Sequence, residues 1–195
     1  MPAMPKNILP TILIVIVLIA IGGWIWYAFF DRYHYAVVKN GVLYRDGIRS
    51  MHELDLTARD SHVKTIVSLV DDNEIKQPPF TDELAYAAAH HITVDRVPVP
   101  LGGWPDGDQI HRFLAIVADP ANQPVLVHCH QGVRRTGMLV AAYQMSVLGF
   151  TKDQAKAAVL KFGHSERLAN DVEKFIDLYD PIAQQMTQSP QRSQE

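Results

Sequence analysis

The sequence of 195 residues lacks several features that mark particular classes of protein. It holds one cysteine, which excludes an intramolecular disulfide framework and leaves a single free thiol to explain. Its formal net charge of −3 argues against general nucleic-acid binding, which depends on a basic surface. It also contains no internal repeat. The length then leaves room for one globular domain, and nothing in the sequence indicates an oligomeric state.

The longest apolar run, residues 8–30, carries no charge. A helix of roughly 20 residues crosses the hydrocarbon core of a membrane, so this run is long enough to span one. Trp24, Trp26 and Tyr27 cluster near its end, where aromatic side chains favour the membrane interface. A cleaved signal peptide is the competing interpretation, but Lys6 is its only basic residue and no small-residue cleavage site follows. We predict an uncleaved, single-pass transmembrane helix.

This anchor divides the chain into five predicted parts. Basic residues are more numerous just after the apolar run than before it, which favours a cytoplasmic C-terminal domain on a membrane-localised protein. The parts are an N-terminal tail (1–7), a transmembrane anchor (8–30), a linker (31–37), one globular domain (38–180) and a polar, disordered tail (181–195).

Strand-like and helix-like patterns alternate through the globular domain. A turn at Asn40-Gly41 predicts a short hairpin. The alternation is typical of an α/β fold with a largely parallel central sheet flanked by helices. In such folds ligands bind beyond the carboxyl ends of the strands. The predicted strands are 64–70, 92–100 and 124–128, and the predicted helices are 50–60, 81–91, 108–119, 136–149, 151–163 and 168–179.

The single cysteine, Cys129, follows one of these strands in the stretch VLVHCHQGVRRTG. The backbone after it can curl so that successive amide N–H groups point inward at a helix N-terminus, which forms an anion site. Gly132 permits the tight curve, and Arg135 can fork two hydrogen bonds to a phosphate. The positive surroundings lower the pKa of the thiol and favour a nucleophilic thiolate, to which Thr136 can donate its hydroxyl. The stretch therefore predicts a nucleophile in an anion cradle.

Two other interpretations of Cys129 compete with this one. A free cysteine is commonly a small buried hydrophobe. The second alternative is a metal site formed by Cys129, His128 and His130, with His90 and His91 as further ligands. Adjacent strand residues point to opposite faces, which disfavours that metal site, and we expect neither a metal nor a cofactor.

The pattern H-C-x-x-G-x-x-R-T, from His128 to Thr136, resembles the signature loop of cysteine-dependent tyrosine and dual-specificity phosphatases. The stretches Leu43–Gly47 and Thr65–Glu74 are similar to two strand regions of compact atypical members. The resemblance covers roughly residues 38–165. It implies the cysteine-phosphatase fold and hydrolysis of phosphomonoesters through a phosphocysteine intermediate on Cys129, with no metal.

The resemblance also implies a role for each residue of the loop. Cys129 attacks phosphorus while Arg135 binds the equatorial oxygens. His128 is expected to hold the loop in place through its ring hydrogen bonds. Charges on Arg134 and His130 would favour a highly anionic substrate, such as a phosphoinositide or an inositol phosphate. The residues expected to bind substrate are His130, Gln131, Gly132, Val133, Arg134 and Thr136.

The sequence departs from the family's pattern at the general acid. Asp106 stands in a Trp-Pro-Asp tripeptide, which resembles the acid loop of the family, and neighbouring glycines suit a mobile lid. It lies closer to Cys129 than the family's acid usually does. Asp106 also fits a helix N-cap, with Gln109 completing a capping box. We predict Asp106 as the acid; the alternatives are Asp108, Asp71, Asp72 and Glu74.

The predicted function is therefore a phosphatase acting on a phosphorylated protein or a phospholipid. An alternative of another class is a pseudophosphatase, which binds a phosphorylated partner without turnover. No nucleic-acid partner is expected.

Overall fold

The computed structural model describes residues 8–30, 32–162 and 165–181. The chain divides into two compact units, Met1–Asp31 and Arg32–Glu195. The predicted N-terminal tail, and all but the first residue of the predicted C-terminal tail, lie outside the described residues.

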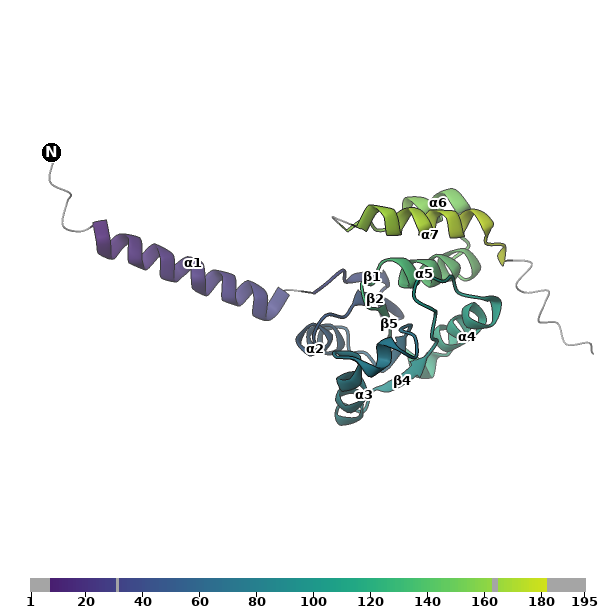
Figure 1. Cartoon of the computed structure of the whole chain (residues 1–195), viewed down its shortest axis with the longest axis horizontal. Coiled ribbons are helices and arrows are strands. Elements are labelled where there is room, and N and C mark those ends of the chain that lie inside the picture. Colours follow the sequence, from purple (N-terminus) through teal and green to yellow (C-terminus); the bar gives the residue numbers. More distant parts are fainter. Residues whose placement is uncertain (1–7, 31, 163–164, 182–195) are drawn as a thin grey trace, which may run out of the picture. The chain divides into compact units, whose positions relative to one another are not determined.

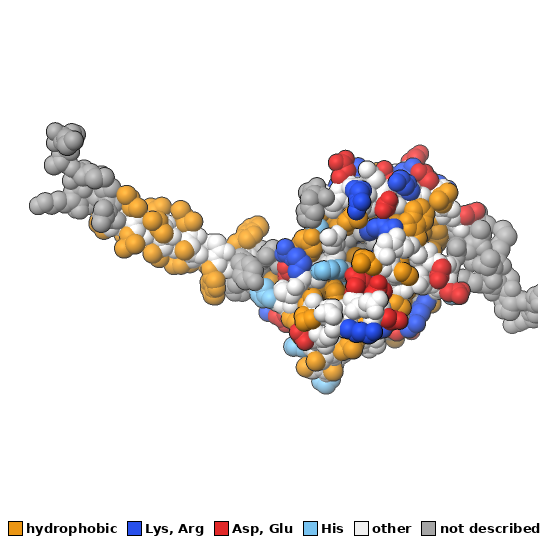
Figure 2. Space-filling model, viewed as in Figure 1, with side chains coloured by type: hydrophobic (Ala, Val, Ile, Leu, Met, Phe, Trp, Pro, Cys, Tyr) orange, Lys and Arg blue, Asp and Glu red, His pale blue; other side chains and the backbone are white. Residues whose placement is uncertain are grey.

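The first unit contains one helix, α1 (Ile8–Phe30), with exposed hydrophobic side chains along it (Figure 2). Across the described residues, no helix reaches the length and apolarity needed to cross a membrane. By this criterion the predicted transmembrane anchor and the membrane localisation are wrong.

The second unit is built on a five-stranded mixed sheet with the order β1-β2-β5-β3-β4 (Figure 1). β1 is antiparallel to β2, and the other neighbours are parallel, which confirms the largely parallel sheet and the hairpin. The strands are β1 (Ala36–Lys39), β2 (Leu43–Gly47), β3 (Thr65–Ser68), β4 (Thr93–Arg96) and β5 (Val125–Cys129).

Helices cover both faces of the sheet, because side chains alternate along each strand. On β5, Val125 and Val127 pack with α4, α5 and α7, whereas Leu126 packs in the cluster with α2 and α3. The helices are α2 (Met51–Asp60), α3 (Phe80–Ala89), α4 (Gly107–Ala118), α5 (Arg134–Ser146), α6 (Lys152–Ala157) and α7 (Glu166–Leu178), with short 3-10 helices η1 (Glu74–Lys76) and η2 (Pro120–Asn122).

Helix boundaries shift by a few residues from the prediction, and α5 and α6 show two such differences. α5 begins at Arg134, two residues early, so that the anion loop runs directly into its first turn. α6 begins with a capping box, made by Thr151 and Gln154, but ends at Ala157 instead of continuing to 163 as predicted. Only Ala155 of α6 is fully buried, so little packing extends this helix.

Candidate active site

β5 places the start of the predicted anion loop at the centre of the sheet, between β2 and β3. All five residues of β5 are buried, and the strand ends at Cys129. In the parallel register Gly47 lies opposite Cys129 and Ser68 lies opposite His128. The ends of three strands thus meet at one edge, with the N-terminus of α5 beyond them, as the sequence predicts for a ligand site.

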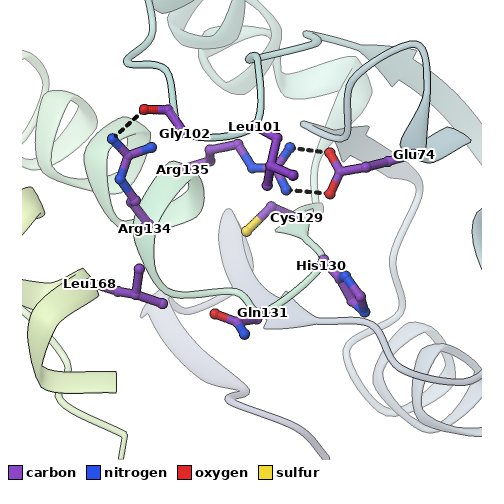
Figure 3. Close-up of a pocket in the computed structure, with 9 residues that line it drawn as sticks. All are labelled: Glu74, Leu101, Gly102, Cys129, His130, Gln131, Arg134, Arg135 and Leu168. Carbon is purple, nitrogen blue, oxygen red and sulfur yellow. Dashed lines mark hydrogen bonds and ion pairs between the residues drawn. The ribbon is translucent and has the colours of Figure 1, made fainter. Parts of the chain in front are cut away.

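A cavity of about 170 Å³ opens at this edge (Figure 3). Five of the predicted site residues line it, namely Cys129, His130, Gln131, Arg134 and Arg135. Four further residues complete the lining: Glu74, Leu101, Gly102 and Leu168. Gly132, Val133 and Thr136 lie in the same loop and helix start but do not line the cavity.

The thiol of Cys129 lies at the base of this cavity and is 3% exposed. The backbone N–H of Gly132 donates to its Sγ at 3.2 Å. Burial alone would raise the pKa of the thiol, but the charge of Arg135 and the hydrogen bonds from Thr136 and Gly132 outweigh it and lower that pKa. The site therefore favours the thiolate, which is the nucleophilic form of cysteine.

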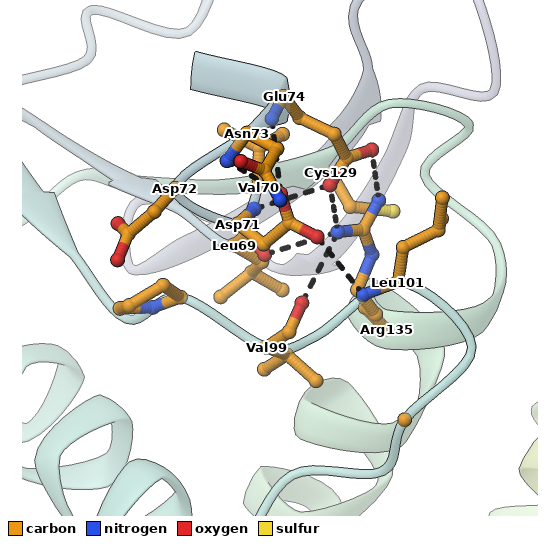
Figure 4. A network of polar contacts seen from close by, with 12 residues as sticks. Leu69, Val70, Asp71, Asp72, Asn73, Glu74, Val99, Leu101, Cys129 and Arg135 are labelled. Atoms are coloured by element: carbon orange, nitrogen blue, oxygen red, sulfur yellow. Dashed lines mark hydrogen bonds and ion pairs between the residues drawn. The ribbon is translucent and has the colours of Figure 1, made fainter. Parts of the chain in front are cut away.

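Arg135 is held rigidly beside the thiol (Figure 4). Its guanidinium forms a two-pronged ion pair with Glu74, with Nη2 donating to Oε1 at 2.7 Å and Nη1 donating to Oε2. Nη1 also donates to the carbonyl oxygens of Val99 at 3.2 Å and Leu69 at 3.4 Å. Burial would lower the pKa of Arg135, but Glu74 and Cys129 raise it, so the group stays charged. The fork is oriented before any ligand enters.

Two glycines let the end of β2 touch the anion loop. Gly132 has a φ of +67°, and a Cβ there would lie 2.4 Å from the carbonyl oxygen of Asp46. A Cβ on Gly47 would lie 2.6 Å from the backbone of Gln131. Arg45, which is buried, donates from Nη2 to the carbonyl of Gly132 at 2.6 Å. The end of β2 and the side chain of Arg45 therefore support the anion loop.

Behind the thiol lies a buried polar cluster that the sequence did not reveal. The Nε2 of His128 lies 2.9 Å from Oε2 of Glu83 on α3, and both side chains are fully buried. Burial would lower the pKa of His128, but Glu83 raises it above its ordinary value. Nearby, burial raises the pKa of Asp46 to about 7, although Thr57 and the N–H of Gly47 donate to it. His128 thus contacts a helix on the other face of the sheet, and its ring is not what holds the loop.

The candidate acids lie mostly outside the cavity. Asp106 is exposed and caps α4, with Oδ1 accepting from the N–H of Gln109 at 2.8 Å in a complete capping box. Asp108 is exposed in the first turn of the same helix. Asp72 pairs with Arg96 at 3.0 Å. Among the described residues only Glu74 is a carboxylate lining the cavity, and its pairing with Arg135 lowers its pKa against the opposing effect of burial.

The two other basic residues of the predicted loop, Arg134 and His130, both make contacts within the domain. Arg134 contacts Asp171 on α7 and two carbonyl groups of the 101–104 loop. The ring of His130 packs edge-on against Phe80, with centroids 5.6 Å apart. In the described part of the chain, no cluster of three or more His, Cys, Asp or Glu side chains is placed to hold a metal ion.

Comparisons with known proteins converge on one group of enzymes. A family model described as "DSP-PTPase phosphatase fused to NAD+ Kinase" matches residues 46–177. The chain is 27% identical to the dual specificity protein phosphatase TpbA of Pseudomonas aeruginosa, over 64% of this chain and 52% of TpbA. It is 34% identical to the inositol diphosphatase SIW14 of Saccharomyces cerevisiae, over 35% of this chain and 24% of SIW14. The chain thus spans about half or less of the length of these relatives.

Solved structures show the same fold. The core catalytic domain of S. cerevisiae SIW14 superimposes with a TM-score of 0.65 at 20% identity, covering 83% of this chain and 94% of that one. P. aeruginosa TpbA gives a TM-score of 0.61 at 22% identity, covering 80% of this chain and 90% of that one. The α/β architecture described above is therefore that of this group of phosphatases.

Proposed function

Because this chain belongs to the DSP-PTPase phosphatase family, we propose that it hydrolyses phosphomonoesters through a phosphocysteine intermediate on Cys129. The observation that carries this proposal is the position of a thiol with a lowered pKa beside the oriented fork of Arg135. We assign the activity to the domain proposed for residues 38–180, which lies within the second compact unit.

In the proposed first step the Cys129 thiolate attacks phosphorus, forming an S–P bond as the ester P–O bond breaks. The leaving oxygen departs with the bonding electron pair and takes a proton. Arg135 and the inward-facing loop amides bind the three non-bridging oxygens, whose charge they stabilise in the transition state. Glu74 holds Arg135 in the required orientation. In the second step water attacks the phosphocysteine, forming a P–O bond as the S–P bond breaks, and the group that protonated the leaving oxygen takes a proton from the water; phosphate and the thiolate are released.

We retain Asp106 as the proposed general acid. It adjoins a loop with two consecutive glycines, Gly102 and Gly103, which suits a segment that moves on binding. To reach the leaving group its carboxyl must give up the cap of α4. The other substrate-contacting roles proposed for His130, Gln131, Gly132, Val133 and Thr136 follow from the loop they form. Arg134 lines the cavity, but its donors are engaged by Asp171 and by the 101–104 loop.

A phosphorylated protein is the first substrate class that we propose, and a phospholipid or inositol phosphate is the second. One observation favours the second class in the form of a phosphoanhydride. Glu74 is the only carboxylate lining the cavity among the described residues, and it is paired as an anion. A phosphate leaving group needs less protonation than an alkoxide does. A phosphoanhydride bond therefore breaks without a general acid in the cavity. The relative SIW14 carries the name inositol diphosphatase.

The test is turnover of p-nitrophenyl phosphate by the full chain, followed by a panel of a phosphotyrosyl peptide, a phosphoinositide and an inositol diphosphate. We expect vanadate to inhibit, Cys129→Ser to abolish turnover while phosphate still binds, and Arg135→Lys to lose about 10²–10³-fold in kcat, because lysine lacks the fork. Phosphate binding without turnover by the wild type would instead establish the pseudophosphatase alternative.

A further inference from the structure

The side chain of Arg134 joins three separate parts of the domain. Its Nε donates to Oδ2 of Asp171 on α7 at 3.0 Å. One terminal nitrogen donates to the carbonyl oxygen of Gly103 at 2.5 Å, and the other donates to that of Gly102 at 2.9 Å, the bond drawn in Figure 3. The side chain is only 14% exposed. Three separate nitrogens of one planar group thus bind three acceptors at once, a spacing that a lysine, with all its donors on one nitrogen, does not reproduce.

The loop that Arg134 holds forms one wall of the cavity. Leu101 and Gly102 both line the cavity, across from the start of α7, where Leu168 lies. The loop begins with a tight turn, in which the N–H of Gly103 donates to the carbonyl of Pro100 at 2.8 Å. The position of this loop therefore sets the width of the cavity mouth.

Apolar packing contributes little to holding residues 101–103 in place. Leu101 is 72% exposed, and the next two residues are glycines without side chains. Further contacts of the loop include the turn between Gly103 and Pro100, the N–H of Leu101 donating to Asp71 at 3.1 Å, and the ring of Trp104 against Phe175 on α7. With so little burial, the two hydrogen bonds from Arg134 are a large share of what fixes the loop.

We propose that Arg134 is a positioning residue that latches the 101–104 loop over the cavity and thereby limits the width of the substrate that enters. The latch is oriented by Asp171, which fixes the guanidinium through Nε and leaves both terminal nitrogens for the loop. The role in substrate selection rests on the proposed phosphatase function; the latch itself does not.

The first experiment measures the loop directly, by hydrogen exchange of the backbone amides of residues 101–104 in the full chain. Asp171→Ala and Arg134→Lys should each speed exchange of these amides by about threefold to tenfold, because charge-assisted hydrogen bonds at a partly exposed site are lost. The matched control is Glu173→Gln, which removes another charge from α7, where Glu173 pairs with Lys161 at 3.4 Å. Exchange in Asp171→Ala and Arg134→Lys that equals the Glu173→Gln control would overturn the latch.

The second experiment compares kcat/KM for a bulky phosphotyrosyl peptide with that for p-nitrophenyl phosphate. In Asp171→Ala the loop is released, and the wider cavity mouth should admit the larger substrate more readily. The value of kcat/KM for the peptide, divided by that for p-nitrophenyl phosphate, should therefore rise by about threefold or more. A merely structural effect would lower both values equally and leave the ratio unchanged, which contradicts the selection role. Arg134→Lys combined with Asp171→Ala should change the ratio no more than the larger single effect, since both act through one latch. If the wild type shows no turnover, the proposed function fails while the exchange data still decide the latch.

Discussion

At the scale of single residues, reactivity at Cys129 comes from charges that the fold brings together. Arg135 and the loop hydrogen bonds lower the pKa of the thiol against the effect of burial. On the other side, Glu83 raises the pKa of His128, which adjoins the thiol in sequence. A cationic His128 stabilises the neighbouring thiolate, so a glutamate on α3 that touches no substrate still bears on the nucleophile.

Replacing Glu83 by glutamine tests this influence. The neutral amide keeps the size of the side chain but removes the carboxyl group that raises the pKa of His128. The pKa of His128 should then fall and that of Cys129 should rise. We expect the acidic limb of the kcat/KM profile to move to higher pH, with activity near pH 6 falling roughly threefold to tenfold and activity near pH 8 changing little. Asp82→Asn, an exposed neighbour on the same helix, is the control. Superimposable pH profiles for the wild type and Glu83→Gln would contradict the prediction.

At the scale of elements, the candidate acid Asp106 also has a structural role as the N-cap of α4. Asp106 accepts from the N–H of Gln109, and Gln109 accepts in return from the N–H of Asp106 at 2.9 Å. Gln109 also donates to the carbonyl of Pro98 at 2.7 Å, which fixes the start of the helix to the preceding loop. The same carboxyl cannot cap the helix and protonate a leaving group at once.

Two substitutions separate these tasks, because asparagine caps a helix about as well as aspartate does. Asp106→Asn should unfold like the wild type in urea, whereas Asp106→Ala should lose about 1 kcal/mol of unfolding free energy. If Asp106 is the acid, both variants should lose most turnover of a phosphotyrosyl peptide and much less of p-nitrophenyl phosphate, whose leaving group needs less protonation. Wild-type turnover of the peptide by Asp106→Asn would move the acid role elsewhere.

Much of this arrangement follows from local sequence. The apolar runs and the N-caps predict the strands and helices, and the spacing of Cys129, Gly132 and Arg135 predicts the loop. The Asp106 capping box is likewise visible in sequence. The ion pairs of Glu74 and Glu83 are not, because they join residues far apart in the chain that only the folded sheet brings into contact. The one local indication was a glutamate on the otherwise apolar face that α3 buries.

At the scale of the whole molecule, the buried carboxyl of Asp46 couples folding to pH. Burial raises its pKa from the ordinary value of 3.8 to about 7. Between these values the folded state binds a proton that the unfolded state releases. The free energy of unfolding should therefore fall as the pH rises through this range, by at most about 1.4 kcal/mol per pH unit for one group. The buried His128, whose pKa is also raised, acts in the same direction above its ordinary value.

Asp46→Asn removes this proton while keeping the hydrogen bonds. The amide oxygen still accepts from the N–H of Gly47, and the amide nitrogen donates to Thr57 in place of the present contact. In urea unfolding at pH 5, 6 and 7, the wild type should lose stability relative to Asp46→Asn as the pH rises. His128 is common to both proteins, so its contribution largely cancels in the difference. Parallel pH dependences for the two proteins would contradict the raised pKa.

The solitary cysteine has a further consequence, which concerns oxidation. A thiolate in an open cavity is the form that peroxide attacks, giving a sulfenic acid. In many redox-regulated proteins a second cysteine captures this species as a disulfide before it oxidises further. This sequence contains no second cysteine, so a sulfenic acid on Cys129 can be trapped only by a backbone nitrogen or by a thiol from outside the chain. Recovery after oxidative stress would then depend on the thiols around the protein and on whether they fit through the mouth of the cavity.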